Sequence, residues 1–168
     1  MPCACKLPLE IYPDAVEWGP ILWKLLHGLS EKSGRPLTPL YAEEERRAWL
    51  TFFKQTGDII PCSACKEHFE MYLKEHPVDE LKHMNLQNIH DWIRRWFWEL
   101  HEWVNDTLKK PSFPFENLTP TYGAVNLRIT LKQFEMPMKK AIEISGYNNK
   151  KFIDWKSKYI RMLSLYGV

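Results

Sequence analysis

The fold class is decided by residues 85–109, which read NLQNIHDWIRRWFWELHEWVNDTLK. Apolar side chains recur in this stretch at spacings of three and four residues, the period of an α-helix that buries one face. These side chains are Ile89, Ile93, Trp96, Phe97, Leu100, Val104 and Leu108. The spacing predicts one helix from about Asn85 to about Lys109, with His101 and Asn105 one turn apart beside its buried seam.

The sequence before this stretch predicts three more helices, of which two precede residue 60. Asp14 and Glu17 have the spacing of a capping box that starts the first helix, and Gly34 stops it. Thr38 is the expected N-cap of the second helix, which Gly57 ends.

The third helix is expected to open at Pro61 and to close at Pro77. After residue 109, several prolines indicate a loop, and beyond it the helical pattern becomes weaker. It still predicts a helix over about 128–145, which Pro137 should kink or split, and a last helix over about 150–165.

The composition indicates one domain that can bury a core without disulfide staples. The chain has 168 residues, of which 45% are hydrophobic, and it contains eight tryptophans. There is no convincing βαβ pattern, so we expect an all-α protein with a four-helix bundle over residues 14–123. A flexible tail over 1–13 would precede the bundle and carry Cys3 and Cys5, and a C-terminal helical extension over 124–168 would follow it.

Charge and hydropathy argue against several partners. A net charge of +2 is too small to indicate nucleic acid or an anionic membrane. No stretch has the length of a transmembrane helix, and the N-terminus lacks the basic and apolar regions of a signal peptide. The expected compartment is therefore the cytosol, where paired cysteines more often indicate redox catalysis or metal binding than structural disulfides.

Two cysteines lie three residues apart at the expected start of the third helix, in the segment PCSAC over 61–65. Cys62 and Cys65 can close a disulfide within one turn, and the helix N-terminus stabilises the thiolate that reacts in thiol–disulfide exchange. The same spacing is also half of a zinc site, which Cys3 and Cys5 or nearby histidines would complete. The spacing alone leaves redox catalysis and zinc binding open.

Two further segments combine aromatic, histidine and basic side chains. Residues 18–27, WGPILWKLLH, place Trp23 and His27 on one helical face, where they either frame a flat cofactor or belong to the core. Residues 101–111, HEWVNDTLKKP, place His101 and Asn105 on one face, with lysines in the last turn. That arrangement suits a ligand with phosphates, or only a helix C-terminus whose dipole the lysines complement.

Taken together, the three segments resemble the Erv/ALR family of FAD-linked sulfhydryl oxidases. The family carries W-G-x-x-x-W-x-x-L-H, C-x-x-C and H-N-x-V-N-x-x-L-x-K-P in this order, and here they occupy residues 18–27, 62–65 and 101–111. The resemblance covers roughly residues 18–123. It implies a bundle that holds FAD at one end beside the CxxC, and an enzyme that forms disulfides in proteins and passes the electrons to O2, giving H2O2.

The resemblance also assigns a role to individual positions. Cys65 would be the cysteine next to the flavin, and Cys62 would exchange with the substrate. Cys3 and Cys5 would shuttle electrons to this pair, unless they are an incidental exposed pair. The cofactor-binding residues that the resemblance implies are Gly19, Trp23, His27, Cys65, His101, Asn105, Leu108, Lys110 and Tyr122.

The short family members of large cytoplasmic DNA viruses are the ones that this chain resembles, because it lacks additional structural cysteines and has Trp98 where one is usual. This implies a location in host cytoplasm or virion, and protein thiol substrates such as a thioredoxin-like or virion protein. The family as a whole implies a homodimer and no metal, and the low net charge indicates neither nucleic acid nor a membrane as a partner. Glu102 replaces the usual Asn of the family. A carboxylate beside FAD phosphates is unfavourable, so we expect its side chain to point elsewhere.

Two hypotheses from other classes stand beside the oxidase. A non-enzymatic zinc-stabilised module with Cys3, Cys5, Cys62 and Cys65 as ligands would bind metal and carry no chromophore. A helical interaction protein with inert cysteines would have neither cofactor nor reactive thiols. Neither hypothesis gives a role to all three segments.

Overall fold

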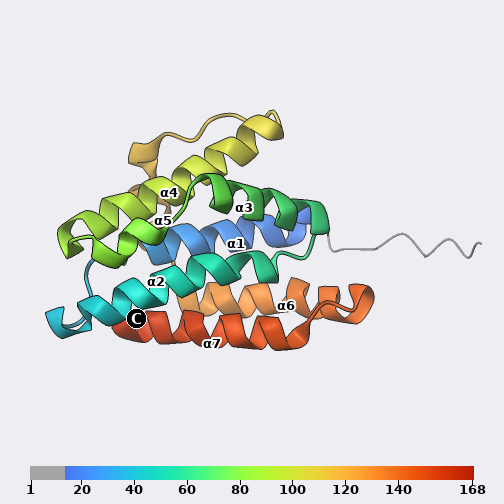
Figure 1. Ribbon diagram of the computed structural model, residues 1–168. Helices are drawn as coiled ribbons and strands as arrows, with labels where there is room; N and C mark the ends of the chain where they lie inside the picture. Colours follow the sequence, from blue (N-terminus) through green and yellow to red (C-terminus); the bar gives the residue numbers. More distant parts are fainter. Residues whose placement is uncertain (1–13) are drawn as a thin grey trace, which may run out of the picture.

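The computed structural model describes residues 14–168, whose regular secondary structure is entirely helical, so the predicted all-α class is confirmed (Figure 1). The helices are α1 (Ala15–Ser30), α2 (Ala42–Thr56), α3 (Ser63–Glu75), α4 (Leu86–Thr107), α5 (Leu118–Tyr122), α6 (Leu127–Ser145) and α7 (Asn149–Leu165). Short 3₁₀ turns lie at Pro39–Tyr41, Gly57–Ile59, Asp79–His83 and Phe115–Asn117. Within the described residues, none of the helices is long and apolar enough to cross a membrane.

Side-chain caps fix where several helices begin. Asp14 accepts a hydrogen bond from a first-turn N–H of α1, and Asn126 and Asn148 do the same for α6 and α7. Glu17 does not complete the predicted capping box, because its carboxylate binds Nζ of Lys140 in α6 at 2.8 Å. The start of α1 is therefore tied to a helix more than a hundred residues later in the chain.

Three details differ from the sequence-based expectation. The 3₁₀ turn Pro39–Tyr41 separates the cap at Thr38 from α2, and α5 forms inside the proline-containing loop. The helix α6 continues through Pro137 instead of splitting there. Phe134 and Met138, on either side of this proline, are both fully buried, so packing holds the helix together across it.

The helices form three layers, with α3 and α4 on one side, α1 and α2 in the middle, and α6 and α7 on the other side (Figure 1). α6 packs along α1, and α7 packs along α2. Trp155 and Tyr159 of α7 lie against Phe52 of α2, with ring centroids 5.5 and 5.9 Å away, and the Tyr159 hydroxyl donates to the carbonyl of Leu25 at 2.9 Å. The C-terminal helices therefore share one apolar core with the bundle.

Three helices carry the predicted site segments, and one end of each of them lies at the same end of the molecule. The chain directions bring the beginnings of α1 and α3 and the end of α4 to the same end of the bundle, on the right in Figure 1. The CxxC begins α3, and the two histidine-containing segments belong to α1 and α4. Residues 18–27 run along most of α1 with His27 in its last turn, so only the start of this segment lies at that end.

Candidate functional site

A disulfide joins Cys62 and Cys65 at the beginning of α3, with their Cα atoms 5.2 Å apart. Cys62 is the N-cap residue, and its Sγ accepts a hydrogen bond from the backbone N–H of Cys65 at 3.2 Å. Both cysteines are half-buried and pack against the core. A sulfur in this position lies at the positive end of the helix dipole, which stabilises a thiolate when the disulfide is opened.

The segment before the disulfide is held by a residue that the sequence analysis did not identify. The Tyr147 hydroxyl, from the turn between α6 and α7, donates to the carbonyl oxygens of Asp58 (2.6 Å) and Ile60 (2.8 Å). The N–H of Cys62 in turn donates to the carbonyl of Ile60 at 2.9 Å. The only sequence signal at Tyr147 was a helix break after residue 145, which carries no information about a partner almost ninety positions away.

Four of the predicted cofactor-binding side chains form one cluster of rings. The indole of Trp23 and the imidazole of His101 are stacked, with centroids 3.8 Å apart and planes 7° from parallel. His27 lies beside them, with Nε2 2.9 Å from Nδ1 of His101, and the ring of Tyr122 stacks on His27 at 4.7 Å. Helices α1, α4 and α5 therefore each contribute to one aromatic surface.

Burial keeps both imidazoles of this cluster neutral. Desolvation, followed by the charges of His101 and Arg94, lowers the pKa of His27 to about 3. Desolvation also lowers the pKa of His101 to about 4, although Glu102 opposes the shift. At neutral pH one imidazole donates and the other accepts in the hydrogen bond between them.

Glu102 is turned toward the loop that follows α4. Its carboxylate accepts hydrogen bonds from the hydroxyl of Ser112, from the N–H of Phe113 at 2.9 Å, and from Nδ2 of Asn105 at 3.1 Å. Burial alone would raise the pKa of Glu102, but these hydrogen bonds lower it. Glu102 thus anchors residues 112–113 to α4, a role for which the sequence held no signal.

The other predicted residues come from the same two helices and from the turn after α4. A Cβ added at Gly19 would meet no atom within 4 Å, so this position of α1 is open. Asn105 is buried, whereas Leu108 and Lys110 are exposed at the end of α4. The N–H of Lys110 closes the helix by donating to the carbonyl of Asn105 at 2.8 Å.

The predicted cofactor-binding residues have the chemistry that a flavin dinucleotide requires. The stacked rings are flat and uncharged, and the exposed Lys110 is a cation of the kind that meets phosphates. Nδ1 of His27 is fully buried and has no hydrogen-bond partner among the described residues. Such an unmet group is costly in a folded protein, and a ligand atom would satisfy it. The set therefore fits FAD.

Cys3 and Cys5 lie outside the described residues. Within residues 14–168, no group of three or more His, Cys, Asp or Glu side chains is arranged to hold a metal ion.

Comparison with known proteins gives a family and several relatives. The sequence profile of the Erv1 / Alr family matches residues 20–123. The mitochondrial FAD-linked sulfhydryl oxidase ERV1 of Saccharomyces cerevisiae is 31% identical over 102 residues, which are 60% of this chain and 48% of the yeast protein. Among viral proteins, the putative FAD-linked sulfhydryl oxidase 347L of Invertebrate iridescent virus 6 is 26% identical over 97 residues, or 58% of this chain and 84% of the viral protein.

A further viral relative is the probable FAD-linked sulfhydryl oxidase R368 of Acanthamoeba polyphaga mimivirus, 25% identical over 89 residues, or 53% of this chain and 57% of that protein. The chain spans about half the length of the first relatives that it matches. No solved structure matches the chain.

Proposed function

The chain belongs to the Erv1 / Alr family, and from this premise we propose that it is an FAD-dependent sulfhydryl oxidase that forms disulfide bonds in proteins. The names of the yeast and viral relatives supply the cofactor and the activity. The observation that carries the proposal to this chain is the Cys62–Cys65 disulfide at the start of α3, at the end of the bundle where α1 begins and α4 ends.

We assign the cofactor site by position in the family pattern. On α1 the residues that would hold FAD are Gly19, Trp23 and His27. From α4 onward they are His101, Asn105, Leu108, Lys110 and Tyr122, and Cys65 would lie next to the flavin. The contacts among Trp23, His27, His101 and Tyr122 support this assignment, because they join the first and third segments of the pattern.

The thiol chemistry begins at the disulfide. A substrate thiolate attacks Sγ of Cys62, so the Cys62–Cys65 bond breaks and Cys65 leaves as a thiolate at the positive end of α3. A second substrate thiolate then attacks the substrate sulfur of the mixed disulfide and releases Cys62. The substrate departs with a new disulfide, and the enzyme holds the two electrons as the Cys62–Cys65 dithiol. The N–H of Cys65, which points to Sγ of Cys62, stabilises the charge on Cys62 as it leaves.

When bound, FAD would supply a two-electron acceptor for this dithiol, with O2 as the final acceptor and H2O2 as its product. The role of the protein is to position the cofactor beside the dithiol and to exclude water from the site. With pKa values of about 3 and about 4, His27 and His101 offer hydrogen bonds without a positive charge at neutral pH. We therefore assign His27 and His101 to binding and positioning, and not to general acid catalysis.

Three further assignments follow from the family resemblance. Cys3 and Cys5 would accept electrons from protein thiols and deliver them to Cys62. The chain would act as a homodimer, and the resemblance to short viral members of the family favours host cytoplasm or a virion as its location. The double variant Cys3→Ser/Cys5→Ser tests the shuttle, because it should oxidise a small dithiol normally and protein thiols more slowly.

The proposed function is tested first by the visible absorption of the purified protein. A flavin band near ~450 nm that dithiothreitol bleaches and air restores is expected. Cys65→Ser should keep the band and lose the bleaching and the thiol oxidation. A colourless protein that cannot be reconstituted with FAD would overturn the proposal, and bound zinc would then favour the metal module.

A further inference from the structure

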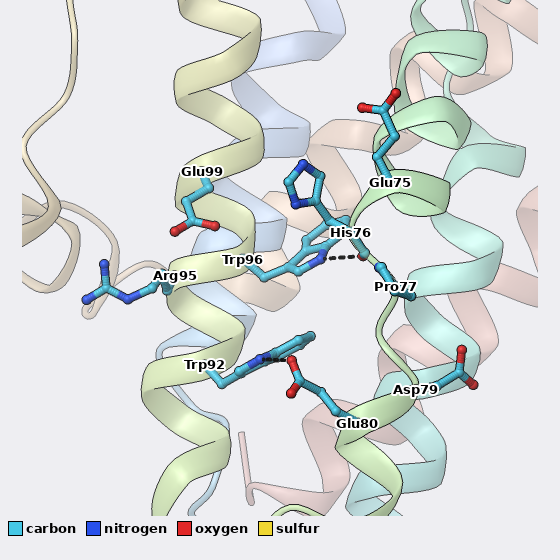
Figure 2. A pocket seen from close by; sticks show the side chains of 9 residues that line it. All are labelled: Glu75, His76, Pro77, Asp79, Glu80, Trp92, Arg95, Trp96 and Glu99. Carbon is cyan, nitrogen blue, oxygen red and sulfur yellow. Dashed lines mark hydrogen bonds between the residues drawn. The ribbon is translucent and has the colours of Figure 1, made fainter.

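A cavity that none of the proposed FAD-binding residues lines lies between the end of α3, the turn Asp79–His83 and the middle of α4 (Figure 2). Its volume is about 480 Å³. Glu75, on its rim, follows Cys65 by ten positions, and both belong to α3. The cavity is therefore about 15 Å along the helix from the disulfide.

Two indoles form the aromatic wall of the cavity, and both are fixed in place. Figure 2 shows Trp92 and Trp96 projecting from α4 toward the α3–α4 connection. Nε1 of Trp92 donates to Oε1 of Glu80 at 2.5 Å, and Nε1 of Trp96 donates to the carbonyl of His76 at 3.0 Å. The ring of Phe53 packs edge-on against both indoles, at 6.1 and 4.6 Å. Because the rings are already positioned, a ligand that binds them orders little further.

The charge on the cavity wall is negative on balance, because four acidic side chains and one guanidinium, that of Arg95, line it. Glu75 and Glu99 line the cavity, and neither forms an ion pair with another described residue. Two lysines bind Asp79, at 2.8 and 3.8 Å. The guanidinium of Arg95 turns away from the cavity in Figure 2 and lies 4.8 Å from the ring of Phe115. Glu75 and Glu99 therefore add unpaired negative charge to the rim, although the carboxylate of Glu75 is turned away from the two indoles in Figure 2.

We propose that this cavity binds a lysine or arginine side chain of the protein thiol that is oxidised at the Cys62–Cys65 disulfide. An indole face attracts a cationic head group, and the free carboxylates of Glu75 and Glu99 add charge complementarity, whereas an anionic group would be repelled. An extended peptide rises about 3.3 Å per residue, so about five residues bridge the cavity and the disulfide. This inference rests on the proposed function and names a substrate class for it. The substrates would be proteins in which a lysine or arginine lies about five residues before or after the reactive cysteine.

The kinetic test compares two dithiol peptides that differ only in having Arg or Gln five positions from the cysteines. The wild-type protein should oxidise the Arg peptide with a kcat/KM about fivefold higher. The variant Glu75→Gln/Glu99→Gln should lower this preference, because only the attraction of the indoles remains, and it should keep the wild-type rate with dithiothreitol. The matched control Glu116→Gln/Asp154→Asn removes the same charge from two exposed positions outside the cavity lining and should keep the preference. No preference in the wild type, or an equal loss in the control, would overturn the proposal.

A binding measurement separates this proposal from the proposed oxidase function. Fluorescently labelled peptides with Ser in place of Cys cannot be oxidised, and the Arg form should bind the wild type about fivefold more tightly than the Gln form. Equal binding of the two forms would refute the basic-residue site even if dithiothreitol is oxidised. If dithiothreitol is not oxidised by the FAD-loaded protein, the oxidase function fails, and the peptide affinities still decide whether the cavity takes a basic side chain.

Discussion

The buried imidazole of His27 should make the folded protein sensitive to mild acid. Burial, with the charges of His101 and Arg94, lowers the pKa of His27 to about 3 in the folded protein. The unfolded chain binds a proton at this residue near pH ~6.5. The neutral form is therefore favoured by folding, so the stability linked to His27 is complete above pH ~6.5 and is lost as the pH falls toward 3.

The size of the effect follows from these two pKa values. Between pH ~7.5 and ~5.0 the unfolded state gains most of one proton that the folded state does not bind, which lowers the free energy of unfolding by about 2 kcal/mol. His101, with a pKa of about 4, acts in the same direction. It is less buried than His27, so its contribution is smaller.

Urea unfolding at the two pH values, followed by tryptophan fluorescence, measures this linkage. In His27→Gln the loss of unfolding free energy between pH ~7.5 and ~5.0 should be about 2 kcal/mol smaller than in the wild type. His83→Gln changes an exposed histidine and should leave the wild-type loss unchanged. The reasoning is refuted if His27→Gln and the wild type lose the same free energy, because protonation of this ring would then not be coupled to unfolding.

Other positions give predictions of defined size. Lys109 has a φ of 53°, so Lys109→Gly should be about 1 kcal/mol more stable in urea unfolding than Lys109→Ala, and the opposite order would contradict the strain argument. Trp155 is 1% exposed, and Trp155→Ala should lower the free energy of unfolding by about 3–5 kcal/mol; a loss under about 1 kcal/mol would show that α7 is not part of the cooperative core. Glu102→Ala should speed hydrogen exchange at the N–H of Phe113, and unchanged exchange would mean that the carboxylate does not hold the loop.

The helices could be predicted from the sequence because their signals are local. The apolar spacing in residues 85–109 gives α4 within two residues at each end, and the last helix predicted over about 150–165 matches α7, Asn149–Leu165. The missed helix α5 contains Pro120, which indicated a loop. Pro120 is its third residue, and at that position the missing N–H has no partner within the helix anyway. Proline therefore could not distinguish a short helix from a loop here.

The ring cluster was only partly predictable. The four-residue spacing of Trp23 and His27 places them on one face of α1, and the resemblance selected His101 and Tyr122. The hydrogen bond between His27 and His101 joins residues 74 positions apart, and nothing in either segment fixes which nitrogens meet. The role of Glu102 was also inaccessible, since it depends on where the chain returns after α4.

The C-terminal region, residues 124–168, contacts the segment before the Cys62–Cys65 disulfide as well as the core. The family match ends at residue 123, yet the hydroxyl of Tyr147 binds the carbonyls of Asp58 and Ile60, just before the disulfide. Nζ of Lys151 binds the Asp58 carboxylate at 2.7 Å. Burial would raise the pKa of the Asp58 carboxyl group, but Lys151 and Lys66 lower it. Because Lys66 belongs to the first turn of α3, charges from α3 and α7 converge on one carboxylate beside the cysteines. The position of the CxxC therefore depends on residues that the family pattern does not contain, and motif matching alone would have treated them as dispensable.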